Sequence, residues 1–156
     1  MARSPNLSVA PADPRQPPIR ALIAELDRLM DSLYPAESNF LVDPEALAGP
    51  DAVFLAGFAD GEPLACGAIL LRPPAYAEVK RIYVSPRARG LGLAKRLLER
   101  LESEARSRGL GALRLETGSR QPEALALFAA RGFRPCGPFG DYPADDPYSR
   151  FMEKPL

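Results

Sequence analysis

The distribution of proline constrains the fold of this chain more than any other feature of its sequence. The 156 residues include 18 prolines, yet Pro122 is the only one between Arg87 and Arg134. Proline removes a backbone N–H donor and breaks the interior of regular elements. We therefore expect long helices and strands in the second half of the chain and shorter ones in the first half.

Hydrophobic spacing predicts the order of the elements. Residues 19–34 carry one apolar stripe at helical spacing, and residues 92–108 do the same before Gly109. Two apolar runs meet around Gly61-Glu62, which is typical of a hairpin. The predicted helices are 19–34, 92–108 and 122–131, and the predicted strands are 52–60, 63–71, 75–84, 113–116, 133–136 and 151–154.

This order predicts an α/β domain, of the α+β kind with a mixed sheet. A length of 156 residues suits one domain with an ordinary core. We expect an extended N-terminal segment with a first strand over residues 1–18, and a single domain over residues 19–156.

Composition excludes several function classes. Twenty basic side chains balance twenty acidic ones, so the net charge is zero, which argues against a nucleic-acid partner. No apolar run approaches the roughly 18 residues of a membrane span, and no membrane partner is expected. Cys66 and Cys136 are too few for a disulfide framework or a zinc site. The expected setting is reduced and cytoplasmic.

The sequence contains no histidine. This absence excludes a Ser-His-Asp triad, a Cys–His pair and any histidine-ligated metal, and no metal is expected. A general base must therefore be a carboxylate, tyrosine, cysteine, lysine or water.

The segment from Arg87 to Ala94 lies between a predicted strand and a predicted helix. Gly90 and Gly92 let the backbone approach a ligand closely, and the helix start offers unpaired N–H groups. Arg87 and Arg89 add positive charge. The segment predicts a phosphate or pyrophosphate site, with an ordinary glycine-containing turn as the alternative.

Other nucleotide motifs fit this segment less well. The P-loop spacing is absent, and a dinucleotide fold would need a small residue where Lys95 stands. Glu116 roughly mimics the ribose-binding acid of that fold, but a strand carrying Glu78, Lys80 and Arg81 is unlike one buried on both faces. A nucleotide-binding oxidoreductase stays open as a third interpretation.

The pattern Arg87-x-x-Gly90-x-Gly92, following a strand that ends Ile82-Tyr83-Val84, resembles the acetyl-CoA signature of the GNAT N-acetyltransferases. The similarity continues through the helix 92–108, the start QPEALALF of the next helix, and Gly132-Phe133. The resemblance implies a GNAT acyl-CoA N-acyltransferase fold, with a central mixed β-sheet flanked by helices, over residues 19–156.

The resemblance also implies acetyl-CoA as co-substrate, entering a gap between the strands 78–84 and 113–116. The residues that it implies for cofactor binding are Ile82, Tyr83, Val84, Arg87, Arg89, Gly90, Leu91, Gly92, Leu93, Ala94, Gln121 and Phe128.

The resemblance implies a glutamate as general base. Glu78 stands where some members of the family place a general-base glutamate, and the alternative is a salt-bridging carboxylate beside Lys80 or Arg81. Glu116 is the second choice of base.

The general acid departs from the family's pattern. The family usually has a tyrosine that protonates the departing sulfur where this chain has Phe128, and a phenyl ring has no proton to donate. Tyr142 is expected to serve instead. The alternatives are protonation by water, Tyr83 or Ser119, or departure of the thiolate as the anion.

The expected acceptor residues are Tyr34, Arg81 and Glu116, with Arg81 able to grip a carboxylate bidentately. The function implied is acetyl-CoA-dependent acetylation of a primary amine of a small molecule by direct attack on the thioester. There are two alternatives. The chain is a protein N-terminal or lysine acetyltransferase, or it is an acyl-CoA-binding module without turnover. A homodimer is left as an option.

Overall fold

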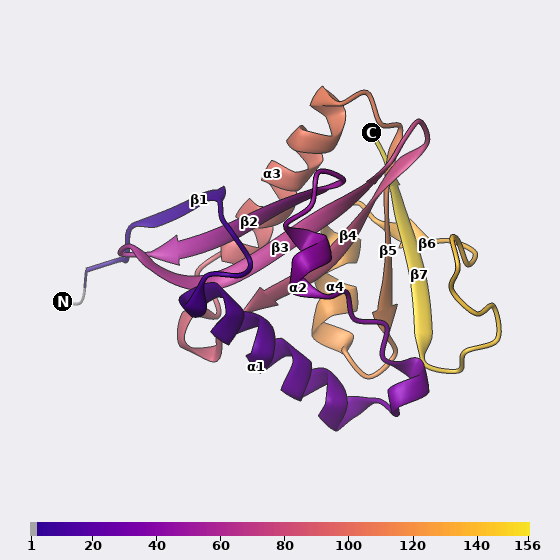
Figure 1. Ribbon diagram of the computed structural model, residues 1–156, viewed down its shortest axis with the longest axis horizontal. Coiled ribbons are helices and arrows are strands. Elements are labelled where there is room, and N and C mark those ends of the chain that lie inside the picture. Colours follow the sequence, from indigo (N-terminus) through magenta and orange to yellow (C-terminus); the bar gives the residue numbers. More distant parts are fainter. Residues whose placement is uncertain (1–2) are drawn as a thin grey trace.

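The structure, a computed structural model, describes residues 3–156 and is built on one seven-stranded sheet of order β1-β2-β3-β4-β5-β7-β6 (Figure 1). The strands are β1 (Leu7–Pro11), β2 (Ala52–Ala59), β3 (Glu62–Arg72), β4 (Tyr76–Val84), β5 (Ala112–Gly118), β6 (Arg134–Pro135) and β7 (Ser149–Pro155). The helices are α1 (Pro17–Leu33), α2 (Pro44–Leu47), α3 (Leu93–Ser107) and α4 (Pro122–Ala130), with short 3-10 turns at Ala36–Ser38 and Pro86–Ala88. The predicted mixed sheet with flanking helices is confirmed, since only β4 and β5 pair in parallel among the strands described.

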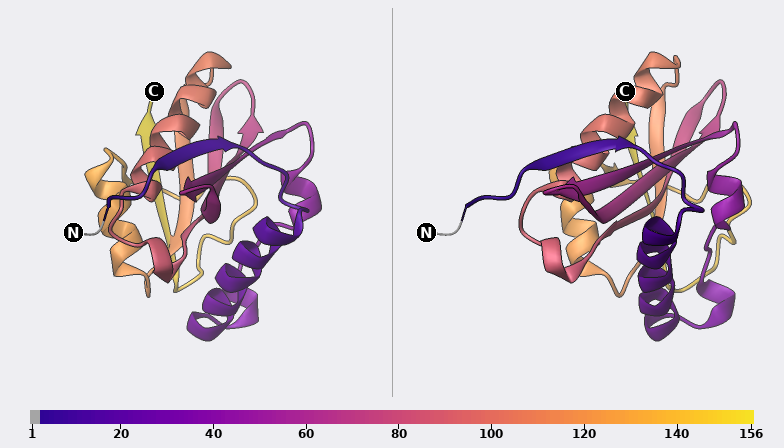
Figure 2. Two further views of the ribbon diagram at one scale, coloured as in Figure 1. Left: turned by 90° about the vertical axis from the view of Figure 1, so that its left-hand side faces the viewer. Right: turned by 60° about the vertical axis from the view of Figure 1, so that its left-hand side comes forward.

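The sheet carries helices on both faces (Figure 2). α3 and α4 cover one face, where Leu97, Leu101 and Phe128 belong to one buried cluster. α1 and α2 cover the other face, where Leu22, Met30 and other side chains form a second cluster. Each side of the sheet therefore has its own core.

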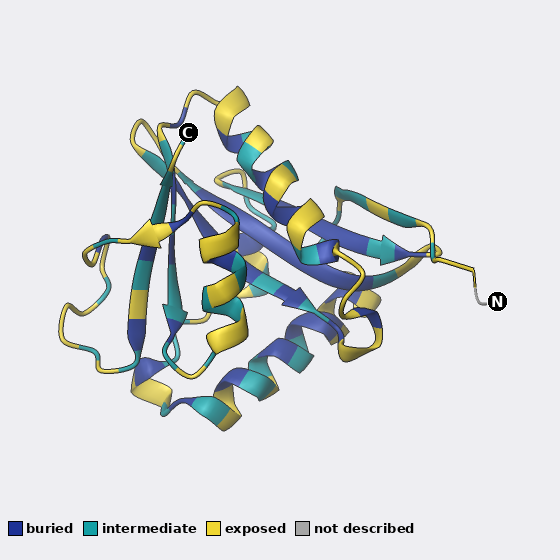
Figure 3. Cartoon of the chain, turned by 180° about the vertical axis from the view of Figure 1, so that it is seen from behind, coloured by how far each residue is buried: buried dark blue, intermediate teal, exposed yellow. Residues whose placement is uncertain are grey.

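The helices bury the stripes that the sequence shows. In α1 the buried side chains are Ile19, Leu22, Ile23, Leu26 and Met30, spaced by three and four residues. α3 turns its buried residues toward the sheet and its exposed residues toward solvent, as Figure 3 shows.

Several bounds differ from the sequence predictions. The strand expected at 113–116 extends over Ala112–Gly118, because its whole length pairs with β7. The strand expected at 133–136 is only Arg134–Pro135. α2 is a short helix that the apolar pattern does not reveal. The segment 1–18 was predicted to be extended with a first strand, and residues 1 and 2 of it lie outside the described range. The first strand is β1, which pairs with β2. The helix α1 begins at Pro17, two residues earlier than predicted.

The pairing between β4 and β5 stops early. Only Ala77 with Leu113 and Glu78 with Arg114 are in register. Beyond these pairs the two strands separate, although each continues for several residues. A gap between strands therefore opens in the middle of the sheet.

β4 also contains a bulge next to this gap. Lys80 pairs with Ala68 and Tyr83 pairs with Cys66, so Gly67 alone faces two residues of β4. The first of those two, Arg81, has φ +60°, a left-handed conformation that non-glycine residues rarely adopt. A bulge bends a strand and leaves a residue out of the ladder, so β4 turns away from β5.

Within residues 3–156, none of the helices has both the length and the apolar character to cross a membrane.

We expect Leu101→Ala to lower the free energy of unfolding by about 2–5 kcal/mol, because the side chain is fully buried under the sheet. The measurement is urea unfolding followed by circular dichroism. Ser103→Ala, on the exposed face of the same helix, is the control and should change stability by less than about 0.5 kcal/mol. Equal stabilities for the two variants would contradict the assigned core.

Candidate functional site

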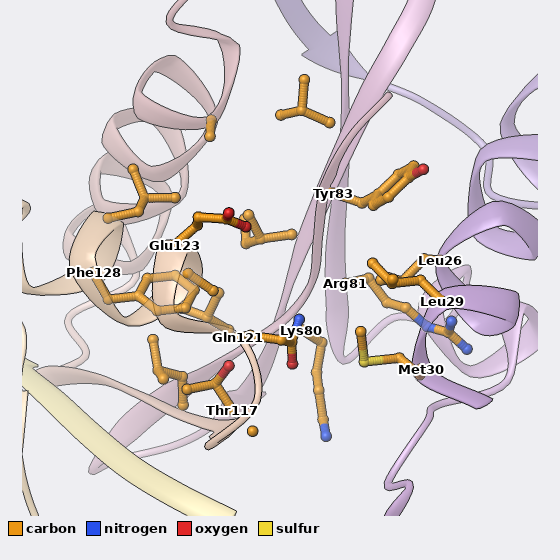
Figure 4. Close-up of a pocket in the computed structure, with 18 of the residues that line it drawn as sticks. Leu26, Leu29, Met30, Lys80, Arg81, Tyr83, Thr117, Gln121, Glu123 and Phe128 are labelled. Carbon is orange, nitrogen blue, oxygen red and sulfur yellow. The ribbon is translucent and has the colours of Figure 1, made fainter. Parts of the chain in front are cut away.

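A cavity of about 590 Å³ occupies the gap between β4 and β5. Its wall includes residues 79–84 of β4 and 115–118 of β5. Figure 4 shows Phe128 and Glu123 of α4 on one side of β4, and Leu26, Leu29 and Met30 of α1 on the other. The cavity therefore reaches both faces of the sheet, and we call its two parts the α3–α4 side and the α1 side.

The glycine-containing segment forms the start of α3 on the α3–α4 side. Gly90 and Gly92 have φ +80° and +88°, in the left-handed region that favours glycine. A Cβ atom at either position would meet no atom of the described chain within 4 Å, so the space above the segment is open. Gly92 is the N-cap residue and offers no capping side chain. The first N–H groups of α3 are therefore available to an anion.

The two arginines of this segment have different environments. Arg89 lines the cavity and donates from Nε to the carbonyl oxygen of Val84 at 3.2 Å. Arg87 lies outside the cavity wall and forms a bidentate ion pair with Glu62, at 2.8 and 2.9 Å. Of the residues predicted for cofactor binding, all but Arg87 and Leu91 line the cavity.

The predicted catalytic pair forms a buried cluster with Lys80. Glu78 accepts a hydrogen bond from the Tyr142 hydroxyl, which in turn accepts one from Lys80 Nζ. Lys80 Nζ lies 3.4 Å from Glu78 Oε2, and the two side chains are only 12% and 8% exposed. Burial, and then the charge of Glu78, raise the pKa of Tyr142. Neither Glu78 nor Tyr142 belongs to the cavity wall.

Glu116 of β5 does line the cavity. Its Oε2 accepts a hydrogen bond of 2.8 Å from the Ser149 hydroxyl of β7. Burial raises the pKa of the Glu116 carboxyl from 4.5 to about 7, against the opposing effects of the Ser149 hydrogen bond and the positive charge of Lys80. A carboxyl group that exchanges protons near neutral pH thus lies in the gap.

Tyr34 closes the end of the gap. Its hydroxyl donates to Gln121 Oε1 and accepts from the Arg120 backbone N–H, both at 3.1 Å. The ring lies against Gly118, where an added Cβ atom would overlap the phenol. The end of α1 is therefore tied to the start of α4 across the end of β5.

Arg81 points from the bulge toward α1, as Figure 4 shows. Its guanidinium is paired with Asp27 and donates to the Val42 carbonyl oxygen at 2.5 Å. Nε is buried and has no partner among the residues described. Arg81 is therefore already paired with a carboxylate of the chain, and the bidentate grip on an acceptor carboxylate expected from the sequence would compete with Asp27 for the guanidinium.

The sequence predictions named Tyr34 and Arg81 on the α1 side, but not the individual apolar side chains of its wall. Its apolar wall comes from Leu29, Leu33, Phe40, Leu41 and Val42. The apolar stripe of α1 was visible in the sequence, but a stripe at helical spacing indicates a core as readily as a cavity wall. Ser149 carries no signal in the sequence, because its role follows from the pairing of β7 with β5.

Comparisons with known proteins agree with this geometry. Residues 19–133 match the model of the acetyltransferase (GNAT) family. The chain is 50% identical over 153 residues to an IAA acetyltransferase of Azospirillum brasilense, covering 97% of this chain and 99% of that one. A crystal structure from Klebsiella pneumoniae, assigned as an acyl-CoA N-acyltransferase, superposes with a TM-score of 0.81 at 36% identity, covering 96% of this chain and 97% of that one.

A more distant structure, the PaiA N-acetyltransferase of Thermoplasma acidophilum in complex with coenzyme A, shares the fold. It superposes with a TM-score of 0.66 at 17% identity, covering 97% of this chain and 99% of that one.

The contact between Gly118 and Tyr34 gives a testable consequence. We expect Gly118→Ala to lower the free energy of unfolding by about 1–3 kcal/mol, because the new methyl group overlaps the phenol. A double-mutant cycle with Tyr34→Ala is the control. Removing Tyr34 should cost less in the Gly118→Ala background than in the wild type, because the clash disappears with the ring. Strict additivity would contradict the contact.

The raised pKa of Glu116 predicts a pH-dependent stability difference. Between pH 4.5 and about 7 the folded chain holds the Glu116 proton more tightly than the unfolded chain, so this group lowers stability as the pH rises. Glu116→Gln removes that loss. The stability of the variant minus that of the wild type should therefore increase from pH 5 to pH 8, as measured by urea unfolding. A difference that does not change with pH would contradict the assignment.

Proposed function

The chain belongs to the GNAT family of acetyltransferases, and on that premise we propose that it transfers the acetyl group of acetyl-CoA to a primary amine of a small molecule. The observation that carries the proposal is the cavity through the sheet. It has open N–H donors at the α3 start on one side and an ionisable carboxyl group, Glu116, in the gap. The relative named IAA acetyltransferase supports a small-molecule acceptor.

Acetyl-CoA supplies an activated acyl group as a thioester, and coenzyme A leaves as a thiol. The open space above Gly90 and Gly92 fits a diphosphate, which the first N–H groups of α3 would hold with Arg89 beside them. The half-buried apolar side chains of Ile82 and Leu127 would contact the pantetheine arm. The bulge turns the backbone of Ile82 toward the gap, where its N–H is proposed to orient the acetyl carbonyl and stabilise the negative charge that develops on it.

We assign the general base to Glu116 in preference to Glu78. An amine that enters as an ammonium ion must lose a proton before its nitrogen can attack, and a base with a pKa near the working pH is the most effective. Glu116 lines the cavity and has a pKa of about 7. Glu78 is held by Tyr142 and Lys80 away from the cavity wall, which supports a role in positioning Lys80.

The second proton of the amine nitrogen passes to the leaving thiolate, so that the products are the amide and coenzyme A as a free thiol. Tyr142, the donor expected from the sequence, lies outside the cavity wall beside Glu78. Tyr34 lines the cavity and bonds Gln121 at the start of α4. It is the phenol that we propose for this transfer in place of the missing tyrosine at Phe128.

The test compares Glu116→Gln with Glu78→Gln by release of free thiol from acetyl-CoA with a panel of primary amines. In the wild type, kcat/KM should rise with pH through about 7, as Glu116 becomes a carboxylate. Glu116→Gln should lower kcat/KM roughly a hundredfold and abolish this rise. Glu78→Gln, the matched control, should keep it.

Three outcomes would change the proposal. A loss of the pH dependence in Glu78→Gln, with Glu116→Gln unaffected, would return the base to Glu78. Acetyl-CoA binding without thiol release for any amine would favour a module without turnover. Thiol release with peptides only would favour a protein acetyltransferase.

A further inference from the structure

The α1 side of the cavity is where the acceptor must bind if the proposed function holds. The start of α3 and the glycine segment place the diphosphate on the α3–α4 side, so the cofactor occupies that part. The amine then reaches the gap from the opposite side, past α1 and the segment 34–48 that follows it. The side chains that line the α1 side of the cavity therefore indicate which kind of acceptor can bind.

Apolar side chains dominate this wall. They come from α1 and from the segment after it, and they are Leu26, Leu29, Met30, Leu33, Phe40, Leu41 and Val42. Leu41 is 38% exposed, one of two large apolar side chains with this much exposure in residues 3–156. An apolar side chain left open on a cavity wall gains free energy when an apolar ligand covers it.

The buried cations of this wall are already neutralised within the protein. Lys80 Nζ donates to the Phe40 carbonyl oxygen at 3.2 Å and to Tyr142, and it forms an ion pair with Glu78 at 3.4 Å. Arg81 is paired with Asp27. A carboxylate on the acceptor would have to break one of these pairs or remain without a partner, and an unpaired buried charge is costly.

Two neutral polar side chains of the segment after α1 are also paired with carboxylates of the chain. Ser38 donates to Asp146 at 2.6 Å, and Asn39 donates to Asp31 at 2.8 Å. On the α1 side, the carboxylate that lines the cavity among the residues described is Glu116, with Lys80, Glu78 and Asp146 as the charged groups around it. Glu123 lines the cavity from α4, on the other side. Glu116 can pair with one ammonium group of the acceptor, and a second ammonium group would find no unpaired carboxylate among the described residues of this wall.

Arg120 also lines the cavity, and it forms no ion pair in the described chain. Its guanidinium stacks on the Tyr148 ring, 4.7 Å from the centroid, and donates to the Leu33 carbonyl oxygen at 2.8 Å. The side chain is exposed at the rim. Its charge is screened by solvent, so it adds little to selection of an acid.

From these observations we propose that the acceptor is a primary amine on an uncharged apolar body, alkyl or aryl, and that amino acids and polyamines are poor acceptors. This inference rests on the proposed function. The reaction is then R–NH₂ with acetyl-CoA giving R–NH–acetyl and free coenzyme A, with R an apolar group seated against α1 and residues 40–42.

Matched amines test the inference directly. Phenethylamine and phenylalanine differ by one carboxylate, and hexylamine and 1,6-diaminohexane differ by one ammonium group. At pH 8, phenethylamine should give a kcat/KM at least tenfold higher than phenylalanine, and hexylamine one at least tenfold higher than 1,6-diaminohexane, as measured by thiol release. Equal values, or a preference for the charged member of either pair, would overturn the inference.

A binding measurement separates this inference from the proposed function. Calorimetry on the full chain saturated with coenzyme A should show N-acetylphenethylamine binding at least tenfold more tightly than N-acetylphenylalanine. This preference would support the inference even if no amine released thiol, a result that would count against the proposed activity alone. Tighter binding of the acid, or no binding of either compound, would overturn the inference.

Leu41 provides a matched pair of variants. Leu41→Gln should lower kcat/KM for phenethylamine about tenfold, whereas Leu41→Met should stay within about threefold, because it keeps the apolar contact. The KM for acetyl-CoA should not change in either variant. If Leu41→Gln matched the wild type with phenethylamine, residues 40–42 would not form the acceptor wall.

Discussion

The early end of the β4–β5 ladder is the constraint on which the rest of the site depends. Two parallel strands that stayed paired would fill the middle of the sheet with hydrogen bonds and leave no passage. Here only two residue pairs are in register, and the bulge opposite Gly67 turns β4 away from its neighbour. The strands separate inside a sheet that has helices on both faces, so the opening is internal to the sheet.

The separation also sorts the polar groups by face. Side chains alternate along a strand, so Glu78 and Lys80 share the α1 face of β4. Glu116 lies on the same face of β5 with Gly118, which contacts Tyr34. The carboxyl groups and the lysine thus gather on the α1 side, while the segment containing Gly90 and Gly92 lies on the α3–α4 side. Proton transfer and anion binding are therefore assigned to opposite faces.

The sequence predicted the helices and strands better than it predicted which side chains carry the chemistry. Proline, glycine and apolar spacing act locally, so α1, α3 and the segment containing Gly90 and Gly92 were readable from the chain. The choice between Glu78 and Glu116 was not, because both stand on strands with similar neighbours in sequence. What distinguishes them is tertiary: Tyr142 comes from a distant loop and Ser149 from another strand.

The acceptor wall has one more property that follows from its place in the chain. Leu41 and its neighbours lie in the segment between α1 and β2, which contributes no strand to the sheet among the residues described. Loops of this kind tolerate sequence change better than the strands that they connect. Such a segment can diverge during evolution while the sheet stays the same, so related enzymes could acquire new acceptors by exchanging its side chains.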